Sequence, residues 1–397
     1  MQKLIIFCAA VLLSTAAAAA PKIAPVPESA WTDEQRELAA TFGKDGITNE
    51  FRTFLSHPQF IRGVFPFENY IFTDTELAPR EREILVLRTA WHTNSTFYWA
   101  KHYPRAIAAG LSAAEIARIA KADLVGWDKF EATLLHAADE VHQNAYISTP
   151  TWQALSARYT QNQMMDAAFT VSETIMMATI VDSIGVEPDA TLTARLPNKA
   201  PRVASAKRQH ELLSEPRIKA IEMADLTPEA HLMLDPSGSN RYVIGIYRTF
   251  VQNQRLYPPR QLQSGYINSK VTITQRQKET AILRAGYLGG AEYEWSAHAG
   301  SGRKAGLSDT EIVQLATPGY VGWSPHDTAI LRGVDEMYAD DKISDETWKS
   351  LATEFNPGQI LDFMVAGSGY RIVSEVLNSF GVKYEPKHES FPVAAKR

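Results

Sequence analysis

A glutamate and a histidine stand 19 residues apart at two places in the chain, as Glu83 with His102 and as Glu279 with His298. Each glutamate lies on the apolar stripe of an expected helix, where lost solvation disfavours its charge unless a cation faces it. The histidine on the next expected helix is the obvious partner. Because an imidazole beside a buried carboxylate can titrate near neutral pH, this pairing predicts proton exchange with a substrate.

A third polar group precedes each histidine by four residues, Tyr98 in the first case and Glu294 in the second. Residues four apart share one face of a helix, so this group and the histidine can reach one pocket. The predicted catalytic residues are therefore Glu83, Tyr98 and His102 at the first place, and Glu279, Glu294 and His298 at the second.

Two other interpretations of these residues stay open. Each glutamate could instead form a structural ion pair with Arg88 or Arg284, or with the histidine, that only holds two helices together. Two carboxylates and an imidazole could also bind a divalent ion. The sequence shows no supporting shell of further histidines or aspartates, so we predict no metal.

Aromatic residues cluster around both motifs, and a flat substrate could pack against some of them. The predicted substrate-binding residues are Trp91, Trp99, Tyr287 and Trp295. The alternative is that most of them belong to the hydrophobic core. Arg52 and Arg248 could hold a substrate carboxylate, although a structural role at a helix end is the favoured interpretation of both.

The two places are related by a fixed offset, because residues 51 to 186 match residues 247 to 382 with a difference of 196. The matches include rare residue types, such as Trp99 with Trp295 and Trp152 with Trp348. A period of this length indicates a duplicated domain rather than a solenoid array, whose repeats are far shorter.

The apolar spacing within each copy is helical, without sustained alternation of the kind that strands show. Ser112 with Glu115, and Ser308 with Glu311, are predicted capping boxes that each begin a helix. We therefore predict an all-α fold. The predicted divisions are a signal peptide at 1–20, a first domain at 21–200 and a second domain at 201–397.

The start of the chain and its overall charge bear on location and partners. An apolar run from Leu4 to Leu13 follows Lys3 and precedes a tract of small residues, which is the pattern of a cleaved secretory signal. We therefore predict a periplasmic or secreted protein that has no membrane segment after cleavage. The net charge of −5 offers no basic field for nucleic acid, so a small molecule is the predicted partner.

These motifs resemble the carboxymuconolactone decarboxylase family, which includes the AhpD-like proteins. The redox branch of that family carries a Cys-x-x-Cys between the glutamate and the histidine. Its cysteine positions are occupied here by Ser95 and Tyr98, and by Ala291 and Glu294. Because no thiolate is available to attack a peroxide, hydroperoxide chemistry is excluded. The resemblance implies the decarboxylase branch, in which a glutamate and a histidine transfer protons without a cofactor.

The predicted function is an exported, cofactor-independent lyase that decarboxylates a small organic or aromatic compound, or cleaves its carbon–carbon bond by a retro-aldol reaction. The alternatives are a non-catalytic periplasmic binding or scaffold protein, and an isomerase or dehydratase that uses the same site. The resemblance also implies symmetric assembly. We therefore expect two AhpD-like helical domains in tandem to form a pseudo-dimer within one chain, which can itself assemble as a homo-oligomer.

Overall fold

The computed structural model describes residues 20–42, 47–200, 212–239, 242–384 and 389–392. The predicted signal segment falls, apart from its last residue, outside the described residues. Within the described ranges the chain forms helices and no strand, which confirms the all-α prediction.

The part of the chain up to residue 200, here called the first half, begins with a 3-10 turn at Glu28–Ala30 and includes one π-helical turn, η3, at Tyr70–Asp74. Its α-helices are α1 (Asp33–Phe42), α2 (Asn49–Phe54), α3 (Pro58–Asn69), α4 (Pro79–His92), α5 (Thr96–Ala108), α6 (Ala113–Ile119), α7 (Lys129–Asn144), α8 (Thr149–Ser156) and α9 (Gln161–Ile184).

The part from residue 212 onward, here called the second half, begins with a 3-10 turn at Met223–Asp225. Its α-helices are α10 (Pro228–Leu234), α11 (Gly245–Phe250), α12 (Tyr257–Ser269), α13 (Gln275–Leu288), α14 (Glu292–Lys304), α15 (Asp309–Leu315), α16 (Pro325–Ala339), α17 (Asp345–Leu351) and α18 (Pro357–Phe380).

Helix bounds recur between the halves at the offset of the sequence. Helices α4, α5, α6 and α9 have the same bounds as α13, α14, α15 and α18 when 196 is added to each residue number. The capping boxes explain part of this agreement. The side chains of Ser112 and Ser308 each accept a hydrogen bond from the backbone N–H of the glutamate three residues later. The side chain of that glutamate accepts a hydrogen bond from the backbone N–H of the serine. The common origin of the halves stays a prediction that this agreement favours.

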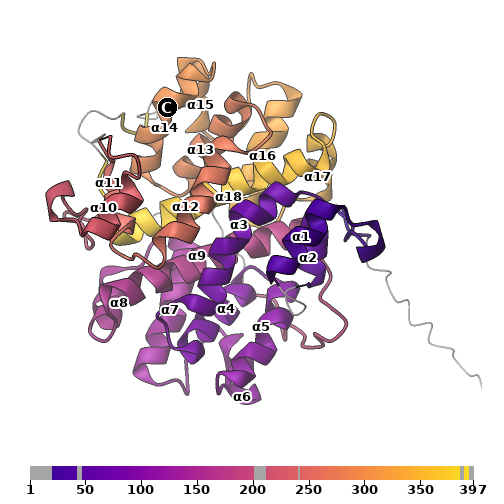
Figure 1. The fold of residues 1–397 in the computed structure, drawn as a ribbon, viewed down its shortest axis with the longest axis vertical. Helices are drawn as coiled ribbons and strands as arrows, with labels where there is room; N and C mark the ends of the chain where they lie inside the picture. The colour runs from indigo at the N-terminus through magenta and orange to yellow at the C-terminus, as the bar shows by residue number, and fades with distance from the viewer. Residues whose placement is uncertain (1–19, 43–46, 201–211, 240–241, 385–388, 393–397) are drawn as a thin grey trace, which may run out of the picture.

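The two longest helices form the centre of the molecule. Helix α9 packs against α18, and α3 packs against α12, so each contact joins the two halves. Figure 1 shows α4 to α8 on one side of these central helices and α13 to α17 on the other. Helix α9 is long and apolar enough to cross a membrane, but its apolar residues are buried inside the protein, as in the core helix of a globular fold.

Contacts across the centre are reciprocal. The backbone N–H of Ile343 donates to Ser183 Oγ at 2.8 Å, and that of Ile147 donates to Ser379 Oγ at 3.0 Å. The two hydrogen bonds are equivalent, with the two halves exchanged. Ile147 and Ile343 differ by 196 in residue number, and so do Ser183 and Ser379. Reciprocal contacts are expected of an interface with a twofold axis. They favour the pseudo-dimer, which stays a prediction.

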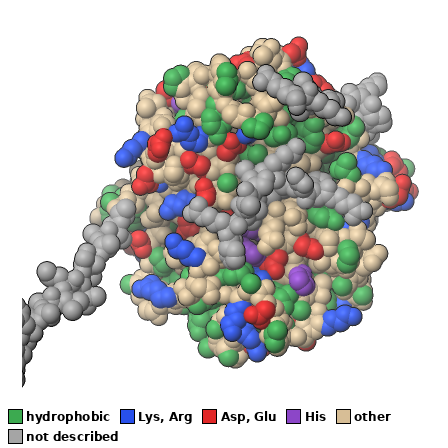
Figure 2. All heavy atoms as spheres, turned by 180° about the vertical axis from the view of Figure 1, so that it is seen from behind, with side chains coloured by type: hydrophobic (Ala, Val, Ile, Leu, Met, Phe, Trp, Pro, Cys, Tyr) green, Lys and Arg blue, Asp and Glu red, His purple; other side chains and the backbone are tan. Residues whose placement is uncertain are grey.

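On the face shown in Figure 2, acidic and basic side chains are interspersed rather than gathered into a patch of one sign. Hydrophobic side chains lie among them. This face therefore offers no concentrated field for a strongly charged polymer.

Candidate functional site

Glu279 and His298 contact each other in the second half. Helix α13 carries Glu279 and α14 carries His298, and these two helices pack side by side. The His298 Nδ1 lies 2.7 Å from Glu279 Oε2. Glu279 is buried, whereas the His298 side chain retains 16% of its surface. A carboxylate at Nδ1 fixes the orientation of the ring and leaves Nε2 free to exchange a proton.

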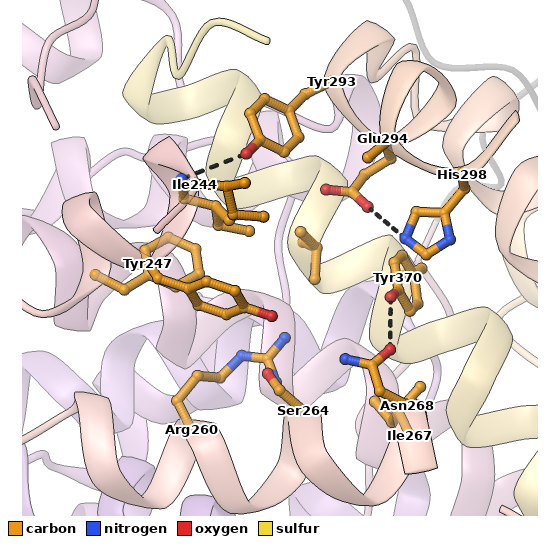
Figure 3. Close-up of a pocket in the computed structure, with 14 residues that line it drawn as sticks. Ile244, Tyr247, Arg260, Ser264, Ile267, Asn268, Tyr293, Glu294, His298 and Tyr370 are labelled. Atoms are coloured by element: carbon orange, nitrogen blue, oxygen red, sulfur yellow. Dashed lines mark hydrogen bonds and ion pairs between the residues drawn. The ribbon is translucent and has the colours of Figure 1, made fainter. Parts of the chain in front are cut away.

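Glu294 approaches the same ring from the other side. It lies one turn before His298 on α14, and its Oε2 is 3.7 Å from His298 Nε2 (Figure 3). Its side chain is buried, and burial raises the pKa of this carboxyl to about 7. A carboxyl with this pKa can act as an acid or as a base near neutral pH. The three predicted catalytic residues of the second half are therefore brought together.

A small pocket with a cavity volume of about 70 Å³ opens beside these groups. Helices α11, α12, α14 and α18 supply its walls, and Figure 3 shows their side chains around the open centre. Glu294 and His298 line it. The other lining residues are Ile244, Ile246, Tyr247, Phe250, Arg260, Ser264, Ile267, Asn268, Tyr293, Ala297, Tyr370 and Val373. This mixture of apolar walls and a few polar groups is typical of a small-molecule site.

The equivalent pair of the first half is sealed. The His102 Nδ1 lies 2.8 Å from Glu83 Oε2, so the predicted pair forms. However, His102 has no exposed surface, and its buried Nε2 has no hydrogen-bond partner. The Phe72 ring packs 4.7 Å from the imidazole, and the Tyr98 ring stacks on it at 5.7 Å. Burial lowers the pKa of His102 to about 4, although Glu83 opposes this shift.

Tyr98 does not serve as a free phenol donor. Its hydroxyl donates to Glu50 and Glu68, at 3.1 and 3.2 Å, and Lys101 bridges the same carboxylates at 2.5 and 2.7 Å. The prediction that Glu83, Tyr98 and His102 form a second catalytic site is therefore not favoured by the structure. His102 is fully buried, and the phenol is engaged in a buried ion cluster.

The two halves nevertheless hold pockets at equivalent positions. A pocket of about 110 Å³ in the first half is lined by Thr48, Glu50, Glu68, Phe72 and Lys101, among others. Adding 196 to each number gives Ile244, Ile246, Ser264, Asn268 and Ala297, all of which line the second pocket. Asn268 in place of Phe72 removes the ring that covers the imidazole. The second pocket therefore reaches its histidine, and the first does not.

The aromatic residues predicted to bind substrate lie outside both of these pockets. Trp99 and Trp295 are at most 1% exposed, and Trp295 packs against Phe391. The Trp91 Nε1 donates to Asn198, and the Tyr287 ring also packs on Phe391. None of the four lines either pocket. Trp295 follows Glu294 directly, so it points about 100° away around the helix and into the core.

The recurring arginines have structural partners. Arg88 forms two hydrogen bonds with the Asp139 carboxylate, and Arg284 forms the equivalent pair with Asp335. They are therefore not the partners of the two glutamates. Arg248 donates to the backbone oxygen of Val243 and pairs with Glu222, and Arg52 lies near Glu28 and Asp189. Neither Arg52 nor Arg248 lines the pocket beside His298.

Sequence reasoning missed Arg260, Asn268 and Tyr370. Tyr370 on α18 places its ring 4.7 Å from that of His298 and donates from its hydroxyl to Asn268 Oδ1 at 2.9 Å. These residues do not recur in the other half, where Val64, Phe72 and Thr174 occupy the positions. A search for recurring polar residues passes over them. What marks these three positions in the sequence is a difference between the copies: one copy has a polar residue where the other has an apolar or smaller residue.

A metal ion was the weaker alternative for Glu279, Glu294 and His298. Among the described residues, no cluster of three or more His, Cys, Asp or Glu side chains has a suitable arrangement for a metal. The His298 Nδ1 is already bonded to Glu279, so only Nε2 could bind another group.

Residues 58–140 match the model of the carboxymuconolactone decarboxylase family. The match includes Glu83 and His102 and ends before the second half. A solved structure described as an alkylhydroperoxidase AhpD core, an uncharacterised peroxidase-related protein from Ralstonia eutropha JMP134, aligns at a TM-score of 0.40 with 19% identity. The alignment covers 46% of this chain and the whole chain of that structure. No curated protein matches. The family is named for a decarboxylase, which supports an enzyme-like function in general terms.

Proposed function

We propose that the protein is an exported, cofactor-independent lyase whose active site is the pocket beside His298. The observation that carries this proposal is the imidazole between two carboxylates at the pocket wall, 2.7 Å from Glu279 and 3.7 Å from Glu294. Export is proposed from the signal-like run Leu4 to Leu13 alone.

The residues have distinct roles in this proposal. Glu279 holds His298 with Nδ1 as the donor, so that Nε2 acts as the base. Glu294, with its pKa near 7, is the second group that can hold or give a proton. The Tyr370 ring packs against the His298 imidazole, and Asn268 accepts a hydrogen bond from the Tyr370 hydroxyl.

Both forms of the reaction use the same groups. In a retro-aldol cleavage, His298 takes the proton of a substrate hydroxyl, the carbon–carbon bond breaks, and a carbonyl product leaves. In a decarboxylation, the substrate carboxylate leaves as carbon dioxide without a prior proton transfer, so the group that later protonates the substrate begins the step in its protonated form. In each case the electron pair stays on the substrate as a carbanion or enolate, and the protonated His298 or Glu294 returns a proton to it.

The test is a screen of the mature protein, without added cofactor, against lactones and lignin-type aromatic compounds, with detection of carbon dioxide and formaldehyde. The turnover of any substrate found by the screen is then measured for the natural protein and for the His298→Asn variant. We expect its kcat to fall by roughly 100-fold or more. The exposed His136→Asn on α7 is the control and should keep its activity. Unchanged turnover in a folded His298→Asn variant would remove the site assignment.

A further inference from the structure

Arg260 is a buried cation on the wall of the proposed active site. It lies on α12 with Ser264, Ile267 and Asn268, which follow at intervals of four, seven and eight residues and so share its helix face. All four line the pocket. The equivalent residue of the first half is Val64, so this charge belongs to the second pocket alone.

The guanidinium has few partners. Arg260 is 3% exposed, its Nη1 donates to Ser264 Oγ at 3.0 Å, and its Cζ lies 5.7 Å from the centre of the Phe67 ring. Its buried Nε has no hydrogen-bond partner. Across the described ranges, no carboxylate oxygen lies within 4.0 Å of it. Figure 3 shows the group pointing from α12 toward the space between Tyr247 and Tyr370.

Two glutamates whose charge acts on Arg260, Glu173 and Glu294, form no ion pair with it and are only partly ionised near neutral pH. Glu173, on α9 of the first half, accepts hydrogen bonds from Gln263 at 2.9 and 3.1 Å, and burial raises its pKa to about 8. Glu294 has its pKa raised to about 7 in the same way. A buried cation without an ion-pair partner is costly, and an anionic ligand that pairs with it would offset that cost.

We propose that Arg260 binds a carboxylate of the substrate, so that the pocket takes a small organic anion. This rests on the proposed function, because it names the substrate class of the same site. The walls are the rings of Tyr247, Phe250 and Tyr370 with the side chains of Ile246 and Ile267, which fit a flat apolar body. An aromatic monocarboxylate combines both features.

The bound carboxylate stays in the product. Loss of carbon dioxide requires an electron pair to leave the carboxylate, and a cation held beside it favours the charge where it is. The bond that breaks therefore lies at the end of the substrate next to His298 and Glu294. This favours retro-aldol cleavage, or loss of a second carboxyl group, over decarboxylation at Arg260.

The experiment measures binding of benzoate, with neutral benzamide as the matched probe, by isothermal titration calorimetry on the whole mature protein. We expect Arg260→Met to weaken benzoate binding by about tenfold or more, and Arg255→Gln, an exposed arginine on the same segment, to leave it unchanged. Benzamide should bind weakly to every variant. Equal benzoate binding by Arg260→Met and the natural protein would overturn the proposal, as would equal binding of benzamide and benzoate.

A thermal melt without ligand gives a second readout. Because Arg260→Met replaces an unpaired buried charge with an apolar side chain, we expect the variant to melt at a higher temperature. A lower melting temperature would contradict the claim that the charge is uncompensated. The binding test is independent of turnover: if benzoate binding depends on Arg260 but His298→Asn retains full activity, the anion site stands and the proposed lyase site falls.

Discussion

Two histidines with the same glutamate partner have different surroundings. His102 and His298 each bond through Nδ1 to a glutamate 19 residues earlier, yet His102 is fully buried and His298 faces a pocket. The residues that differ are Phe72 against Asn268, and Tyr98 against Glu294. In the first half two aromatic rings close over the imidazole, whereas in the second half an amide and a carboxyl leave it accessible.

Glu294 predicts the pH dependence of turnover. Its carboxyl is protonated below its pKa of about 7, so a reaction that needs it as an acid slows as the pH rises through about 7. In the Glu294→Gln variant, we expect this fall in rate above pH 7 to be absent and the maximum rate to be lower. The measurement is kcat between pH 5.5 and 8.5, roughly, for both proteins. An identical basic limb in the variant would assign it to another group.

His102 predicts a contribution to acid sensitivity. Its pKa is lowered from 6.5 to about 4, so the unfolded chain takes up a proton at a higher pH than the folded chain does. Stability is therefore retained above pH 6.5 and falls as the pH decreases toward 4. Urea unfolding at both pH values should show this loss reduced in His102→Gln. A variant that loses as much stability as the natural protein on acidification would contradict the assignment.

At the scale of elements, a buried tyrosine–aspartate pair anchors the long helix of each half. The Tyr70 hydroxyl donates to Asp166 on α9 at 2.8 Å, and Tyr266 donates to Asp362 on α18. Each aspartate also accepts a backbone N–H, from Glu76 and Thr272, at 2.7 Å. These pairs explain why the tyrosines recur in both copies, and they tie η3 and α12 to the central helices.

Removing either hydroxyl should destabilise the fold. Tyr266→Phe and Tyr70→Phe each leave a buried carboxylate with one partner fewer, which costs roughly 1–3 kcal/mol. Urea denaturation measures this loss, and Tyr103→Phe, on a half-buried position of α5, is the control with little expected change. If the three variants unfold at the same urea concentration, the pairs do not stabilise the helices as described.

Most of the fold follows from local patterns in the sequence, whereas only part of the site does. Helical periodicity and the capping boxes at Ser112 and Ser308 act within a few residues, so they can be recognised without tertiary information. The Glu279–His298 contact could also be predicted from the sequence, because the spacing of 19 residues between glutamate and histidine occurs in both copies. Which faces of α12 and α14 meet the pocket depends on packing between helices, so the sequence alone places neither Trp295 in the core nor Arg260 at the pocket wall.

At the scale of the whole molecule, the halves cover each other's apolar surface. Helices α9 and α18 are buried along almost their whole length and pack on each other. A half expressed alone exposes this surface to water, which costs about 25 cal/mol per Å² of apolar area.

The halves should therefore depend on each other. We expect 21–200 and 201–397, cut at the predicted boundary, to aggregate or remain unfolded when expressed singly and to form a one-to-one complex when co-expressed. Sedimentation velocity and circular dichroism would show this. Two soluble, folded and separate monomers would mean that the central contact is not needed for folding.

The central claim is that the pocket of the second half, and not the sealed pair of the first, carries the chemistry. The most direct test is kcat/KM, on a substrate found by the screen, for Glu279→Gln/His298→Asn and for the equivalent Glu83→Gln/His102→Asn. We predict that the first variant remains folded with its activity abolished, and that the second loses stability but, where folded, turns over normally. Full activity in the first variant, or loss confined to the second, would contradict the account.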